Sequence, residues 1–258
     1  MAQPNISSNS RLIILSLIIT CSIFLSACLN DAPRRIAPKA DKGILDLTNW
    51  DLREDGPVDL TGEWEFYWSR HLSPSDFSKE KLPDNKEFIK VPGYWKNNEI
   101  SGSQHPSDGF ATYRLSLILN QNKEALALKM QEISVAYTLY VNGGQVTSLG
   151  IAGKDRETTV PRQLHQVVDF KALDSRVEII AQVSNFHHRR GGGPWEVMQL
   201  GTEQEIRQIH ERGLNLDWFL FGSLFIMALY HLGLFLFRKT DRSPLYFSIF
   251  CFLIASRL

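Results

Sequence analysis

Three aromatic residues stand out as candidates for ligand binding because they fall outside any regular strand pattern. Tyr94 and Trp95 follow Pro92 and Gly93, and Trp195 follows a run of three glycines and one proline. An aromatic ring can cover the apolar C–H face of a sugar ring. The sequence therefore predicts Tyr94, Trp95 and Trp195 as stacking residues of a binding site.

A basic pair precedes the same glycine run. Arg189 and Arg190 could donate forked hydrogen bonds to a carboxylate or to sugar hydroxyls, so we predict that they bind the same ligand. The alternative is a solvated turn whose glycines only satisfy backbone geometry. His187 and His188 come just before, but adjacent side chains diverge in a strand and no nearby Cys or Asp supports a metal ion. No metal and no cofactor is expected.

An enzymatic role is not predicted. Glu63 and Glu65 could suggest a glycosidase, which needs an acid and a base or nucleophile on either side of a sugar cleft. Both lie on one strand face without a convincing partner, so we interpret them as solvated strand residues. The sequence contains no Gly-x-Ser-x-Gly elbow and no phosphate-binding glycine loop.

The elements that must position these residues are short strands. Apolar and polar residues alternate from Leu60 to Trp68, which is typical of a strand with one buried face. Asn142, Gly143 and Gly144 suit a tight hairpin. Many short strands without helical patterns between them indicate a mainly β fold, an antiparallel sandwich or jelly roll. Further strands are expected at 87–91, 113–119, 126–130, 135–141, 145–149, 166–170, 177–183 and 195–200.

The chain begins with an apolar segment typical of export. Residues 12–28 form a hydrophobic stretch after Arg11 and end in small residues. The sequence LSAC at 25–28 resembles the lipobox of bacterial lipoproteins, which predicts lipidation at Cys28. The alternative is an uncleaved signal anchor. Residues 29–43 are polar and contain prolines, which is typical of a tether.

A second apolar segment predicts a membrane span. Residues 218–237 carry no formal charge, and a helix of this length matches the roughly 30 Å core of a bilayer. Arg238, Lys239 and Arg242 follow, so the positive-inside rule places that loop in the cytoplasm and the β domain outside the cell. Another apolar run begins at Leu245 and ends too soon to cross, which suggests a truncated product or a fragment.

A short helix should join the β domain to the span. Thr202 and Glu205 have the spacing of a capping box, and apolar residues then recur at helical spacing. We therefore expect a juxtamembrane helix at 201–217. It could couple the domain mechanically to the membrane or serve as a passive linker.

Composition excludes some classes of function. The 258 residues include 28 basic and 28 acidic side chains, and the formal net charge is zero, which argues against nucleic-acid binding through a large basic surface. The three cysteines, Cys21, Cys28 and Cys251, all lie in apolar segments. The stability of the β domain therefore cannot depend on disulfides.

Several motifs resemble one family of membrane receptors. The β domain resembles the type 2 extracellular domain of bacterial seven-transmembrane receptors with diverse intracellular signalling modules, the DISM receptors, and the C-terminal part resembles the start of their membrane domain. The motifs are GEWEFY at 62–67, VPGYW at 91–95, ATYR at 111–114, YVNG at 140–143, VSNF at 183–186, GGG at 191–193, GSLFIMALYHLGLF at 222–235 and DRSPLYF at 241–247.

The resemblance implies a galactose-binding-like jelly roll that senses a carbohydrate or another small ligand outside the cell. In that family an intracellular signalling module, such as a cyclase, kinase or phosphatase, follows the seventh helix. This sequence lacks that module and about five helices. We therefore expect the ligand-sensing part of a bacterial membrane receptor; the alternative is an autonomous membrane-anchored carbohydrate-binding protein without signalling output.

The expected organisation follows from these segments, with carbohydrate or a small molecule and membrane lipid as partners. It comprises a signal and lipobox segment at 1–28, a tether at 29–43, an extracytoplasmic jelly roll at 44–200, a juxtamembrane helix at 201–217, a transmembrane helix at 218–237, and a cytoplasmic loop with the start of a second helix at 238–258.

Overall fold

The chain divides into two compact units, Met1–Ile36 and Ala37–Leu258, and both large β sheets belong to the second unit. Cys28 and the predicted signal segment lie outside the described residues. The computed structural model describes residues 35–79, 83–100, 103–120, 125–130, 136–172 and 174–257.

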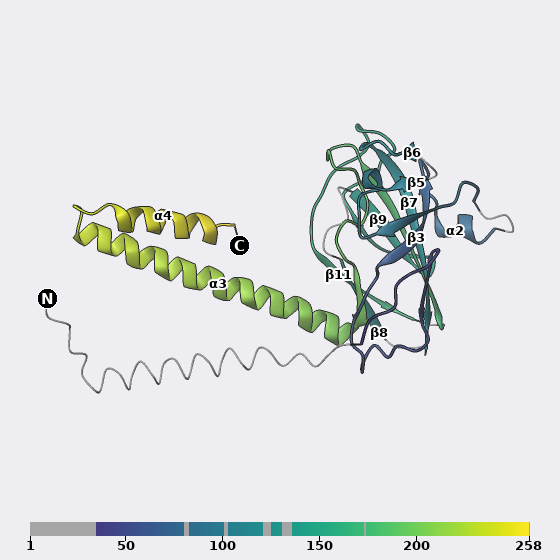
Figure 1. Cartoon of the computed structure of the whole chain (residues 1–258), viewed down its shortest axis with the longest axis horizontal. Coiled ribbons are helices and arrows are strands. Elements are labelled where there is room, and N and C mark those ends of the chain that lie inside the picture. Colours follow the sequence, from purple (N-terminus) through teal and green to yellow (C-terminus); the bar gives the residue numbers. More distant parts are fainter. Residues whose placement is uncertain are drawn as a thin grey trace. The chain divides into compact units, whose positions relative to one another are not determined.

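The larger of two packed sheets has seven strands (Figure 1). Its order is β10-β9-β12-β7-β3-β4 with antiparallel neighbours, and β1 (Ile44–Leu47) pairs in parallel with the last residues of β7. The other strands are β3 (Gly62–Trp68), β4 (Glu87–Val91), β7 (Gly109–Leu119), β9 (Ala136–Val141), β10 (Gly144–Leu149) and β12 (Arg176–Asn185).

The smaller sheet is antiparallel and has the order β11-β8-β13-β2. These strands are β2 (Val58–Asp59), β8 (Ala125–Met130), β11 (Gln166–Lys171) and β13 (Gln199–Thr202), and a separate hairpin joins β5 (Glu99–Ile100) to β6 (Ser103–Gln104). The inner faces of the two sheets meet in one core that contains Trp64, Leu115 and Leu128. The predicted mainly β sandwich is confirmed.

The outer face of the larger sheet is partly covered. Residues 70–79, with the short helix α2 (Pro74–Phe77), lie over β3, β7 and β12, where Tyr67, Phe77 and Ile180 form a second small cluster. Thr112 Oγ1 accepts from the backbone N–H of Leu72 and holds the segment in place. This cover was not predicted from the strand alternation alone.

Strand register defines two ends of the sandwich. At the helix end, Leu119, Leu126 and Ala172 come together around a cavity of about 180 Å³, and Thr202 of β13 lies opposite Leu126. At the other end, which we call the loop end, the hydroxyl of Tyr137 in β9 donates to Gln166 of β11 at 3.1 Å. The loops after β10 and β12 lie at the loop end because these strands run away from the helix end. Strand β4 runs the other way, and hydrogen bonds tie the segment that follows it to the loop after β12.

Helix α3 (Glu203–Phe237) begins directly after β13. Thr202 caps it by accepting from the backbone N–H of Glu205 at 3.3 Å, as predicted, and the Thr202 hydroxyl donates to the Glu205 carboxylate. The predicted juxtamembrane helix and membrane span form one continuous helix. Within the described part of the chain, α3 is the helix that is long and apolar enough to cross a membrane.

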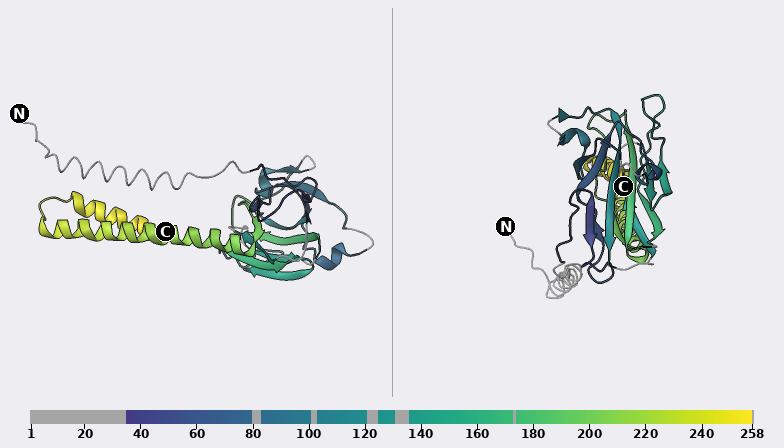
Figure 2. Two further views of the ribbon diagram at one scale, coloured as in Figure 1. Left: turned by 90° about the horizontal axis from the view of Figure 1, so that it is seen from below. Right: turned by 90° about the vertical axis from the view of Figure 1, so that its right-hand side faces the viewer.

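Helix α4 (Ser243–Ala255) folds back antiparallel beside α3 (Figures 1 and 2). Ser248 Oγ donates to the carbonyl of Ala228 at 2.8 Å, and the rings of His231 and Phe247 lie 4.5 Å apart. His231 therefore faces the neighbouring helix, as expected of a polar residue in an apolar span.

Candidate functional site

Two loops at the loop end are joined by hydrogen bonds. The N–H of Gly93 donates to the carbonyl of Pro194 at 2.9 Å, and that of Trp95 donates to Gly192 at 3.0 Å. Ser107 Oγ donates to the carbonyl of Arg189 at 2.8 Å. The structure therefore brings together the two sequence segments that were predicted to form a site.

Trp95 packs between the two loops as a buried side chain and is not a ligand-binding residue. Its side chain is 0% exposed, and Nε1 donates to the carbonyl of Pro106 at 2.9 Å. Residues Trp95–Asn97 form a short 3-10 helix, η1, that turns the indole into the sandwich core. The prediction that Trp95 stacks on a ligand is wrong because no face of the ring is free.

The other two predicted aromatic residues form a platform at the surface. The rings of Tyr94 and Trp195 lie 5.8 Å apart and nearly parallel, at 12°, and both are half-buried. Tyr94 also stacks with His188 at 6.0 Å and 27°. We call Tyr94, His188 and Trp195 the aromatic platform. Its half-buried rings suit contact with an apolar ligand face.

A cleft of about 260 Å³ adjoins this platform. Its lining residues are Pro161, Arg162, Gln163, His187 and His188. His188 belongs to both the platform and the cleft, and its Nδ1 is buried with no hydrogen-bond partner among the described residues. We call this the basic cleft.

Sequence reasoning missed the loop at 161–163, which follows Val160 without any periodic pattern. Its only signal was a polar run with a basic side chain between two strands. The predicted arginines, Arg189 and Arg190, follow His188 directly and are exposed. Among the described residues, no group of three or more His, Cys, Asp and Glu side chains is placed to hold a metal ion.

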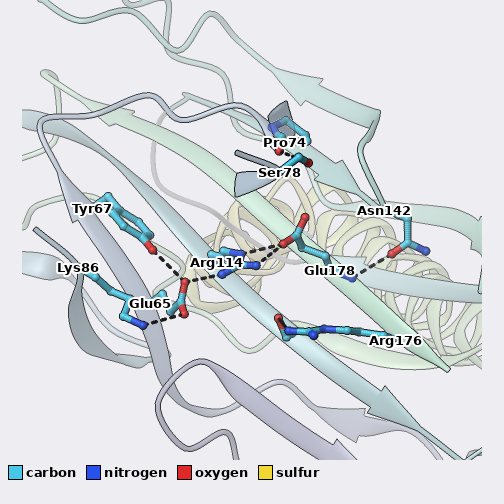
Figure 3. A network of polar contacts seen from close by, with 10 residues as sticks. Glu65, Tyr67, Pro74, Ser78, Lys86, Arg114, Asn142, Arg176 and Glu178 are labelled. Atoms are coloured by element: carbon cyan, nitrogen blue, oxygen red, sulfur yellow. Dashed lines mark hydrogen bonds and ion pairs between the residues drawn. The ribbon is translucent and has the colours of Figure 1, made fainter. Parts of the chain in front are cut away.

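Glu65 is not solvated, contrary to the prediction. It is 8% exposed and accepts from Arg114 at 2.9 Å, from the Tyr67 hydroxyl at 3.0 Å and from Lys86 at 3.4 Å (Figure 3). Arg114 also donates through Nε and Nη2 to Glu178, at 2.8 and 2.6 Å. These contacts tie β3, β7 and β12 together across the outer face of the sheet.

The charges in this network support one another electrostatically. Burial opposes the charged form of Arg114, but the hydrogen bonds that it donates to Glu178 and Glu65 keep its pKa above the usual value. Burial and the negative charge of Glu65 raise the pKa of Tyr67 well above its usual value, so its hydroxyl stays protonated and donates. Because Glu65 is already held by three donors, the network has the character of a structural clamp.

At the helix end, α3 is fixed to the sandwich by its first two turns. Ile206 is fully buried and packs close to Gly201, and Arg207 pairs with Asp169 of β11 and with Glu203 at 3.2 Å. An open cleft of about 730 Å³ lies where β13 meets α3. Its lining residues are Arg53, Ala125, Thr202, Glu203, Gln204, Glu205, Arg207 and Gln208.

Comparison with known proteins finds a family match for the C-terminal part of the chain. Residues 214–258 match the family described as 7TM diverse intracellular signalling. Among curated proteins, none matches the sequence significantly.

The sandwich is similar to parts of solved glycosidases, each aligned over 56% of this chain. A GH2 β-galacturonidase from Eisenbergiella tayi is 16% identical over 24% of its own length, with a TM-score of 0.39. A β-glucuronidase from Ruminococcus gnavus in complex with D-glucuronic acid is 14% identical over 29%, with a TM-score of 0.41. A GH2 member from Bacteroides cellulosilyticus is 16% identical over 20%, with a TM-score of 0.40. The chain spans less than a third of the length of these enzymes.

Proposed function

We propose that the chain is the ligand-sensing part of a bacterial membrane receptor, because residues 214–258 match the family described as 7TM diverse intracellular signalling. In this proposal the sandwich binds a carbohydrate or another small ligand, and α3 passes the signal to the membrane helices. The role is one of binding, without catalysis.

The proposed topology places the sandwich outside the cytoplasmic membrane. Arg238, Lys239 and Arg242 lie between α3 and α4, where the positive-inside rule predicts a cytoplasmic loop. Cys28, which lies outside the described residues, would supply a lipid anchor on the same side as the sandwich. An intracellular signalling module would then receive the signal on the opposite side.

The aromatic platform is the observation that carries the binding proposal. Tyr94 and Trp195 keep part of their rings at the surface although other large aromatic side chains, such as Trp64 and Tyr113, are completely buried. Arg189 and Arg190 are exposed on the same loop and can donate to ligand oxygens. Loops that a rigid β framework positions commonly carry binding residues.

The junction between β13 and α3 supports signal transfer. No flexible segment separates Thr202 from the helix, and Ile206 is buried in the sandwich. A shift of β13 on ligand binding would therefore move α3 with it. This favours the mechanical coupler over the passive linker.

The test compares two tryptophan variants of the full chain in detergent micelles. A panel of neutral and acidic mono- and oligosaccharides is screened by calorimetry against the wild type. Trp195→Ala should weaken binding by about tenfold or more with little change in melting temperature, since a lost stacking ring costs on the order of 1–3 kcal/mol. Trp95→Phe should lower the melting temperature instead. Binding that is insensitive to Trp195→Ala would contradict the proposed site.

A further inference from the structure

The basic cleft has a lining without acidic side chains. Arg162, His187 and His188 contribute the ionisable groups of its wall, and Arg189 and Arg190 follow immediately along the chain. Guanidinium and imidazole groups that converge on one cleft favour an anionic occupant. Within the described ranges, the structure shows no ion pair that neutralises any of these groups.

Two acidic side chains in the neighbouring loops already have partners. The carboxylate of Asp155 accepts from the N–H and the hydroxyl of Thr158, each at 2.7 Å, and these bonds lower its pKa. Asp108 lies 3.7 Å from Arg156. Both carboxylates therefore already interact with nearby residues.

His188 connects the cleft to the aromatic platform. One face of its ring stacks with Tyr94, and its buried Nδ1 lacks a partner among the described residues. Because His188 belongs to both, a ligand that covers the platform lies next to the cleft.

From this arrangement we infer that the ligand is an acidic saccharide. The inference rests on the proposed function and specifies the ligand class of the same site. The sugar ring packs on Tyr94 and Trp195, and its carboxylate binds in the basic cleft, where Arg162 can donate two parallel hydrogen bonds. The cleft volume of about 260 Å³ suits one charged group and the ring edge next to it.

The test uses pairs of probes that differ only in charge. Glucuronate and galacturonate are each compared with their neutral C6 methyl esters, by calorimetry on the full chain in detergent micelles. At least one acid should bind about tenfold or more tightly than its ester, a difference of about 1.4 kcal/mol. Arg162→Gln should remove that difference. Lys90→Gln, which neutralises an exposed cation on β4, should leave it unchanged.

The outcomes separate this inference from the proposed function. If acid and ester bind equally well, and Trp195→Ala still weakens both, the inference that the ligand is acidic is overturned and the proposed binding site stands. If sulfate binds as tightly as the sugar acids, without dependence on Trp195, the inference that the ligand is a saccharide is overturned. Absence of binding by both acids and both esters overturns the inference, and the neutral saccharide panel then decides the proposed function by itself.

Discussion

Gly192 lies directly against the indole ring of Trp95. A Cβ at residue 192 would stand 2.3 Å from the ring and 2.9 Å from the Cβ of Asn185, closer than real Cβ contacts. Glycine is therefore required at this position for space, and the close approach lets the two site loops share hydrogen bonds.

Gly192→Ala should destabilise the sandwich by about 1–3 kcal/mol because the added methyl group would collide with the buried ring of Trp95. Thermal unfolding of the full chain in detergent measures the change. The control is Gly213→Ala, at an open position on α3, where alanine should be neutral or should stabilise the helix slightly. Similar melting temperatures for both variants would contradict the packing argument.

The clamp on the outer face predicts a strong effect of Arg114→Met. Glu65 would remain buried without its guanidinium partner, and leaving one charge of a buried pair alone costs about 3–5 kcal/mol. Denaturant unfolding provides the free energy. The double variant Arg114→Met with Glu65→Gln should recover part of the loss. A loss below about 0.5 kcal/mol in the single variant would show that the network behaves as an exposed one.

His71 predicts a pH dependence of stability. Burial, together with repulsion from Lys154, lowers its pKa to about 4, whereas an unfolded histidine titrates near 6.5. Between these values the unfolded chain binds more protons than the folded one. Stability should therefore fall as the pH drops from about 6.5 to 4, by up to about 3 kcal/mol, and this contribution should then level off.

Chemical unfolding at several pH values measures this slope, and His71→Gln should flatten it. Asp76 acts in a separate range. Hydrogen bonds from Lys79 and Ser73 lower its pKa to about 2, so its contribution is lost only as the pH falls from about 4 towards 2. A slope between pH 6.5 and 4 that persists in His71→Gln would assign it to other groups.

The proposed topology predicts the behaviour of reporter fusions. A cytoplasmic-type reporter fused after Arg242 should be active, because the loop between α3 and α4 carries three basic residues. An export-dependent reporter at the same position should be inactive. The reverse pattern would place the sandwich in the cytoplasm and would remove the basis for an extracellular ligand.

Most strands were predictable because burial of one sheet face leaves a period of two in the sequence. The segments expected at 87–91, 126–130 and 166–170 coincide with β4, β8 and β11 to within one residue. The segment expected at 195–200 does not, since only Gln199 and Leu200 of it belong to β13. Trp195 lies in the preceding loop, where alternation no longer reports on burial.

The errors in the site have a common physical origin. Alternation reports whether a side chain points to the inner or the outer face, but it does not report what covers the outer face. Glu65 is buried on the outer face by partners distant in sequence, Arg114 and Lys86, which the alternation does not reveal. The burial of Trp95 is likewise invisible to the alternation, since a loop without periodicity turns its ring into the core.

In the proposed topology, the continuity of α3 also sets the distance between the sandwich and the lipid. Ile206 and Arg207 lie against the sandwich, and the uncharged segment starts at residue 218. The nine residues at 209–217 are helical and therefore about 13 Å long, which exceeds the roughly 5–8 Å of one headgroup layer. In the proposed topology this spacing keeps the sandwich clear of the lipid headgroups, so a water-soluble ligand reaches it from the bulk phase.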